Sequence, residues 1–202
     1  MNWQPDWTGQ TCFILGGGPS LRGFDANRLR GRRVIGINEA GLTMAPWCDV
    51  LMWADQRWLD WNKDRLHLHT GALKVCRHVS PPDGVHRMKF RPPGFAMARD
   101  TVGGQDCGSS AINLAVHFGA SRIVLLGFDC HDMPMSSWRE GNWHSAHRLP
   151  PLEGQRGGKF APAHDQLSRD LKQKRPGVSV LNATQGSALT CWPIVDLETV
   201  ID

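Results

Sequence analysis

The sequence predicts an α/β fold in which a Rossmann-like, mostly parallel β-sheet is flanked by helices. Short apolar runs alternate along the chain with helical or loop segments, as expected for βαβ units. A glycine-rich turn directly follows the first apolar run, as in doubly wound sheets. The chain has 202 residues, of which 41% are hydrophobic, enough for a domain with a buried core. We therefore expect a single domain over residues 1–202.

Six apolar runs are the expected strands, at residues 11–15, 34–37, 50–53, 72–76, 122–126 and 178–181. The run at 122–126 is the clearest, because it is strongly apolar and ends at Gly127. Short apolar runs of this kind are typical of strands that are buried on both faces of a sheet.

Two helices are expected between these strands, over residues 109–118 and 160–174. The first has apolar residues on one stripe, and Gly119 is a natural end for it. The second places Leu167 and Leu171 four residues apart, on the same helix face.

A loop-rich segment at residues 131–162 follows the strand that ends near Gly127. It is rich in Gly, His, Trp and Arg and has no clear periodicity. A stretch of this length without periodicity is usually functional or partly disordered. We therefore expect a His- and Trp-rich insertion after this strand.

Composition indicates which kind of ligand and which cellular compartment to expect. The net charge of +4 favours anionic ligands but is too small to indicate a nucleic-acid-binding protein by itself. The six cysteines form no CxxC pair, which indicates a reduced, cytoplasmic protein. We see no signal peptide and no apolar run long enough for a membrane span.

The glycine-rich turn Gly16-Gly17-Gly18-Pro19-Ser20 is the first candidate binding site. Glycines allow a sharp turn that brings backbone N–H groups close to an anion, and a following helix N-terminus would favour phosphate. Ser20 could cap that helix or donate to a phosphate oxygen. The turn lacks both the Walker Gly-Lys-Ser/Thr and the GxGxxG spacing. The alternative is a tight turn without a ligand.

Polar residues also follow other expected strands or precede the first expected helix. Asn38 and Asp55 each come at or just after a strand end, where α/β sheets bind ligands. Gly108, Ser109 and Ser110 open the expected helix at 109–118, where N–H groups and hydroxyls could bind a phosphate. The alternatives are an Asx turn at Asn38 and helix caps at Asp55 and Ser109.

Asp129 and three later histidines are the candidate catalytic residues. Asp129 ends the clearest strand, and His131, His144 and His147 follow within the loop-rich segment. Such a set could supply a general base or acid, or bind a divalent metal. No further pattern identifies a zinc site, and solvent-exposed histidines are the alternative.

The order of these motifs resembles one superfamily. It contains the archaeal 6-hydroxymethylpterin diphosphokinase-like proteins, the Maf flagellin glycosyltransferases and the bacterial sialyltransferases that use CMP-sialic acid. The resemblance covers about residues 11–190 and is carried by Gly16–Leu21, Asn38, Asp55, Gly108–Ser110 and Gly127–Asp129. It looks closest to small phage-encoded members, through Trp143–His147 and Asn182–Thr184.

The resemblance implies a nucleotide bound over the glycine-rich turn. It also implies that Asn38, Ser109 and Ser110 contact the nucleotide or sugar, and that His144 or His147 is the general base. The chain has no tyrosine, whereas the sialyltransferases place tyrosines near the leaving phosphate.

We therefore expect a nucleotide- or nucleotide-sugar-binding transferase, with glycosyl transfer from a CMP-type donor favoured. N–H groups near Gly17, Gly18 and Ser109 would stabilise the leaving phosphate. One alternative is a Mg²⁺-dependent ATP diphosphokinase that acts on a pterin-like alcohol, with Asp55 and Asp129 as metal ligands. Another is a non-catalytic nucleotide-binding phage protein in the host cytoplasm. No motif identifies the acceptor, and the sequence leaves open whether the protein forms a homo-oligomer.

Overall fold

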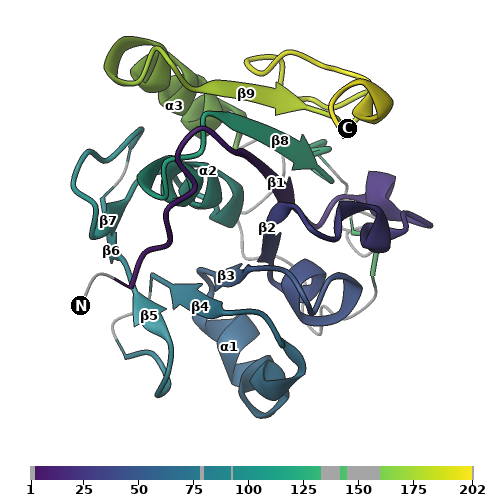
Figure 1. Cartoon of the computed structure of the whole chain (residues 1–202), viewed down its shortest axis with the longest axis vertical. Helices are drawn as coiled ribbons and strands as arrows, with labels where there is room; N and C mark the ends of the chain where they lie inside the picture. Colours follow the sequence, from purple (N-terminus) through teal and green to yellow (C-terminus); the bar gives the residue numbers. More distant parts are fainter. Residues whose placement is uncertain (1–2, 78–79, 92, 133–141, 145–159, 202) are drawn as a thin grey trace.

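The computed structural model describes residues 3–77, 80–91, 93–132, 142–144 and 160–201. Its centre is a seven-stranded sheet in the order β5-β4-β3-β2-β1-β8-β9, in which all neighbouring strands are parallel (Figure 1). The strands are β1 (Thr11–Leu15), β2 (Arg33–Ile37), β3 (Val50–Trp53), β4 (Leu73–Cys76), β5 (His86–Arg87), β8 (Arg122–Leu126) and β9 (Ser179–Asn182). The predicted α/β fold with a mostly parallel sheet is therefore confirmed.

Side chains of the central strands are buried on both faces of the sheet. In β1, Cys12 and Ile14 pack on one face, whereas Phe13 and Leu15 pack on the other. All four are fully buried. This double burial explains why the strand is a continuous apolar run in the sequence.

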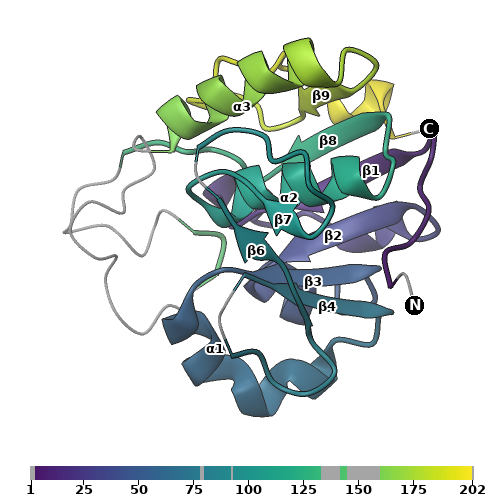
Figure 2. The same ribbon diagram turned by 90° about the vertical axis from the view of Figure 1, so that its left-hand side faces the viewer.

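Two helices cover one face of the sheet. They are α2 (Cys107–His117) and α3 (Ala161–Lys174), and their apolar side chains join Cys12 and Ile14 in the larger core (Figure 2). Both match the predicted helices at 109–118 and 160–174. The helix α2 is almost entirely buried, as expected for a helix between the sheet and a second layer.

Shorter elements cover the other face. They are the 3₁₀ turns η1 (Pro19–Leu21), η2 (Ala26–Leu29) and η4 (Lys63–Leu68), the π-helix η3 (Ala40–Met44) and the helix α1 (Gln56–Asn62). The 3₁₀ turn η7 (Leu197–Thr199) lies near the end of the chain. A second, two-stranded parallel sheet consists of β6 (Lys89–Phe90) and β7 (Thr101–Val102).

All six predicted strands are present, and the elements that the sequence did not indicate are short. Most of the predicted insertion at 131–162 lies outside the described residues. The six cysteines are free thiols, as predicted. No helix within the described part of the chain is long and apolar enough to cross a membrane.

The order of the strands creates a switch point between β1 and β8. From β1 the chain proceeds through β2, β3, β4 and β5 to one edge of the sheet, whereas β8 and β9 lie on the opposite side of β1. In sheets of this kind ligands bind in the crevice at the carboxyl ends of the strands on either side of such a point. The glycine-rich turn after β1 and the loop after β8 therefore flank the expected binding crevice.

Candidate functional site

The glycine-rich turn is bonded directly to the loop after β8. The backbone N–H of Gly16 donates to the carbonyl of Leu126 at 2.8 Å, and that of Gly18 donates to the carbonyl of Gly127 at 2.8 Å. A Cβ at Gly16 would lie 2.6 Å from the Gly127 oxygen, and one at Gly18 would lie 2.7 Å from it. Both positions therefore require glycine because of close backbone approach.

Asp129 accepts the hydrogen bonds of Ser20, whose hydroxyl was a candidate phosphate contact. Its carboxylate accepts from the Ser20 backbone N–H at 3.0 Å and from the Ser20 hydroxyl at 2.7 Å. A Cβ on Gly18 would overlap the same carboxylate. Asp129 thus fixes the turn from within the protein, and the Ser20 hydroxyl, for which the sequence suggested a helix cap or a phosphate contact, donates to it instead.

The helix expected directly after the turn is not formed. Pro19–Leu21 make only a 3₁₀ turn of three residues, with Pro19 at its start and Gly18 as the N-cap. The expectation of a helix N-terminus at this position was therefore wrong, because the chain leaves the helical conformation at Arg22. The favourable helix dipole that was expected to attract a phosphate is absent here.

The described part of the His/Trp segment lies on the glycine-rich turn. The backbone N–H of Trp143 donates to the carbonyl of Gly17 at 3.1 Å, and the guanidinium of Arg22 donates to the carbonyl of Asn142 at 3.0 Å. The His144 ring packs edge-on against Trp143, with 4.7 Å between ring centroids. The structure thus brings His144 to the turn from over 120 residues away in the sequence, whereas His147 lies outside the described residues.

Asn38 combines an unusual backbone conformation with an unpartnered polar atom. Its φ of 52° is left-handed, a conformation that Asn adopts more readily than most residues other than glycine. Its backbone N–H donates to the Met52 carbonyl at 2.9 Å, which fixes it at the end of β2. Its side-chain oxygen Oδ1 is buried and has no hydrogen-bond partner within the part of the chain that the structure describes. A buried acceptor without a partner in this position is suited to a hydroxyl or amino group of a ligand.

Asp55 acts as the N-cap of α1. Its carboxylate accepts from the Arg57 backbone N–H at 2.9 Å and pairs with the Arg57 guanidinium at 3.2 Å. Asp129 is occupied in the same way by Ser20. Within the described residues, no group of three His, Cys, Asp or Glu side chains could hold a metal ion.

The residues at the start of α2 make their hydrogen bonds and packing contacts within the protein. Ser109 is buried and completes a capping box with Asp106, its hydroxyl lying 2.9 Å from the Asp106 carboxylate. Ser110 is also buried; its hydroxyl donates to the Gly103 carbonyl at 3.0 Å and accepts from Arg77 at 3.1 Å. A Cβ at Gly108 would lie 2.5 Å from the ring of Phe128, in the loop after β8.

These contacts also limit the backbone donors that were expected to bind the leaving phosphate. The N–H of Gly18 donates to Gly127, and the N–H of Ser109 donates to the Asp106 carboxylate at 2.9 Å. Among the described residues the Gly17 N–H has no hydrogen-bond acceptor. Of the N–H groups of Gly17, Gly18 and Ser109, that of Gly17 is therefore the one that can donate to a ligand.

A buried histidine that sequence reasoning missed lies against Asp106. His164 on α3 has no exposed surface, and its Nε2 is 3.3 Å from the Asp106 carboxylate. The indole N–H of Trp192 donates to His164 Nδ1 at 3.1 Å, so the ring proton is assigned to Nε2, facing Asp106. Burial raises the pKa of Asp106, but His164 and the hydrogen bonds from Ser109 outweigh it and lower the pKa to about 2.

The loop after β8 is held by the segment that follows β9. Thr184 accepts from the Phe128 N–H at 3.0 Å, and Ser187 donates to the Phe128 carbonyl at 2.5 Å. Cys130 has a left-handed φ of 53°, and His131 contacts the Gly186 carbonyl at 2.8 Å. The loop that carries Asp129 is therefore fixed in place before any ligand binds.

Comparison with solved structures shows a similarity to one described as the structure of MAf glycosyltransferase from Magnetospirillum magneticum AMB-1. The chain is similar to it in fold. The TM-score is 0.63 and the sequence identity 17%, over 96% of this chain and 34% of that one. The chain thus spans about a third of the length of this glycosyltransferase. No family model matches the sequence, and a search of curated proteins found no match.

Proposed function

We propose that the chain is a glycosyltransferase-like transferase that binds a nucleotide sugar in the crevice at the carboxyl ends of β2, β1 and β8. The observation that carries the proposal is Asn38, whose buried Oδ1 has no partner among the described residues and which has a left-handed backbone at the carboxyl end of β2. Polar residues at the carboxyl ends of parallel strands line the edge of the sheet at which α/β proteins bind ligands. The fold shared with a glycosyltransferase supports the same reaction class.

In this proposal the contacts to the nucleotide sugar differ from those expected of a phosphate-binding helix. Asn38 Oδ1 accepts from a ribose hydroxyl or from the amino group of a base, with a CMP-type donor favoured. The Gly17 N–H donates to the phosphate, whereas Ser20 stays bonded to Asp129. Asp129 then positions the turn and does not itself contact the reacting atoms.

Nucleotide binding and the role of Asn38 are tested together. Titration with CMP, UDP and ATP, each with and without Mg²⁺, is followed by tryptophan fluorescence and thermal melting. We expect CMP or UDP to stabilise the protein without metal, by about 2.7 kcal/mol at about 100 times Kd. The Asn38→Gly variant should bind about fivefold to tenfold more weakly, because one hydrogen bond is lost.

The same variant should fold as well as the wild type. Glycine adopts a left-handed φ without strain, so the free energy of unfolding should change by no more than about 1 kcal/mol. Arg122→Ala is the control, because Arg122 is exposed at the amino end of β8, on the opposite edge of the sheet from Asn38, and should leave affinity unchanged. Stabilisation by ATP with Mg²⁺ alone would favour the diphosphokinase, and the absence of any response would refute nucleotide binding.

The catalytic step is proposed to use His144 or His147 as the general base that deprotonates an acceptor hydroxyl. His144 is placed at the turn by Trp143, which bonds to Gly17. We expect His144→Ala or His147→Ala to lower the release of CMP from a CMP-sugar by about 100-fold, with nucleotide affinity nearly unchanged. Equal turnover in both variants would remove the histidines from the mechanism.

A further inference from the structure

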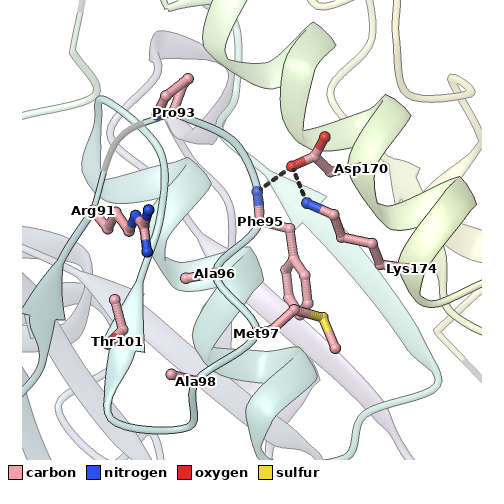
Figure 3. Close-up of a pocket in the computed structure, with 9 residues that line it drawn as sticks. All are labelled: Arg91, Pro93, Phe95, Ala96, Met97, Ala98, Thr101, Asp170 and Lys174. Atoms are coloured by element: carbon pink, nitrogen blue, oxygen red, sulfur yellow. Dashed lines mark hydrogen bonds and ion pairs between the residues drawn. The ribbon is translucent and has the colours of Figure 1, made fainter.

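A cavity of about 580 Å³ lies between the loop that joins β6 to β7 and the C-terminal half of α3 (Figure 3). Its volume is within the range of small-molecule pockets. The lining residues Asp170 and Lys174 come six and ten residues after His164 on α3, about 9 and 15 Å further along the helix axis. Since His164 contacts Asp106 at the start of α2, the cavity is separate from the crevice between β1 and β8.

The loop that forms one wall of the cavity is fixed to both helices. Asn113 of α2 accepts from the backbone N–H groups of Ala96 at 2.9 Å and Gly103 at 2.8 Å. Asp170 of α3 accepts from the backbone N–H of Phe95 at 2.9 Å. These bonds satisfy the loop backbone from two sides, so the cavity is formed before any ligand binds.

The charge that faces the cavity is positive. Asp170 is neutralised, because its oxygens accept from Lys174 at 2.9 Å, from Phe95 and from Gln166 at 2.7 Å. The backbone N–H of Arg91 donates to the Val102 carbonyl, but its guanidinium has no hydrogen-bonding or ionic partner among the described residues. In Figure 3 the Arg91 side chain and Lys174 lie on opposite sides of Phe95.

Apart from Thr101, the rest of the lining is apolar. It includes Pro93, Phe95, Met97 and Ala98. Phe95 is buried, whereas Met97 is 49% exposed, and its flexible thioether can adapt to the shape of a bound group. An unpaired guanidinium beside an apolar wall recognises a molecule that has both an anionic group and an apolar body.

We infer that this cavity is a second ligand site, which takes a small organic anion whose carboxylate, sulfonate or phosphate is attached to an aromatic or alkyl body. Arg91 binds the anionic group, and Phe95 and Met97 contact the apolar body. The site is independent of the nucleotide crevice, and its occupant is a different molecule from the donor.

The test uses 8-anilinonaphthalene-1-sulfonate, an aromatic sulfonate whose fluorescence increases in apolar sites, titrated into the full chain. We expect saturable binding that Arg91→Ala weakens by about tenfold, because a charge-assisted contact is lost. Arg122→Ala is the control, since Arg122 is exposed at the start of β8. Ala98→Trp should also weaken binding, because the indole fills the cavity from an exposed position.

Saturating CMP separates this site from the proposed crevice. Unchanged binding of the probe in the presence of CMP supports the second site, and displacement of the probe by CMP would overturn it. Wild-type affinity in both Arg91→Ala and Ala98→Trp, with unchanged thermal melting, would overturn it as well. The two variants decide whether the cavity holds the probe, and their outcome does not depend on whether the crevice binds CMP.

Discussion

Replacing Asp106 with alanine is expected to lower the free energy of unfolding by about 3 kcal/mol. The substitution removes the N-cap of α2 and leaves the buried Nε2 of His164 without its neighbouring carboxylate. Urea unfolding at pH 7 measures the loss. Asp83→Ala is the control, because Asp83 is exposed and the substitution should change stability by no more than about 0.5 kcal/mol. Equal stability of the two variants would show that the Asp106–His164 pair contributes nothing.

The stabilisation that Asp106 contributes should also decrease as the pH is lowered. Its pKa is about 2 in the folded protein, below the ordinary value of 3.8, so the folded state binds fewer protons than the unfolded state. The stabilisation is therefore complete above about pH 4 and is lost as the pH falls towards 2. The stability difference between wild type and Asp106→Asn should shrink by about 2 kcal/mol over this range. A constant difference would contradict the lowered pKa.

The sheet could be predicted because its strands are buried on both faces. Such strands appear in the sequence as unbroken apolar runs, and each of the six predicted runs became a strand. The two-residue strands β5, β6 and β7 are too short to show a period. The helix α1 was not predicted for a related reason, since its seven residues span only about two turns.

The partners of the candidate site residues could not be predicted from sequence. Ser20 and Asp129 are 109 residues apart, so no local pattern shows that the anion at the turn is the protein's own carboxylate. The left-handed φ of Asn38, and the lack of a partner for its Oδ1 among the described residues, likewise appear only in the folded chain. His164 could have been found, because it is three residues before Leu167, on the apolar stripe that Leu167 shares with Leu171.

The Gly18→Ala substitution should abolish nucleotide binding and destabilise the protein by about 3 kcal/mol. The added methyl group would overlap the Asp129 carboxylate and lie 2.7 Å from the Gly127 carbonyl. The turn can accept it only if Asp129 withdraws from Ser20 or the turn separates from the loop after β8. Thermal melting gives the stability change, and CMP titration gives the affinity.

Gly177→Ala is the matched control, because a Cβ at Gly177 meets no atom within 4 Å and should leave stability and affinity unchanged. Adding Asp129→Ala to Gly18→Ala removes the carboxylate but not the Gly127 carbonyl, so it should restore only part of the stability. Full recovery would mean that the carboxylate is the sole obstacle. Wild-type CMP affinity in Gly18→Ala would show instead that the nucleotide does not bind at the turn, whatever happens to stability.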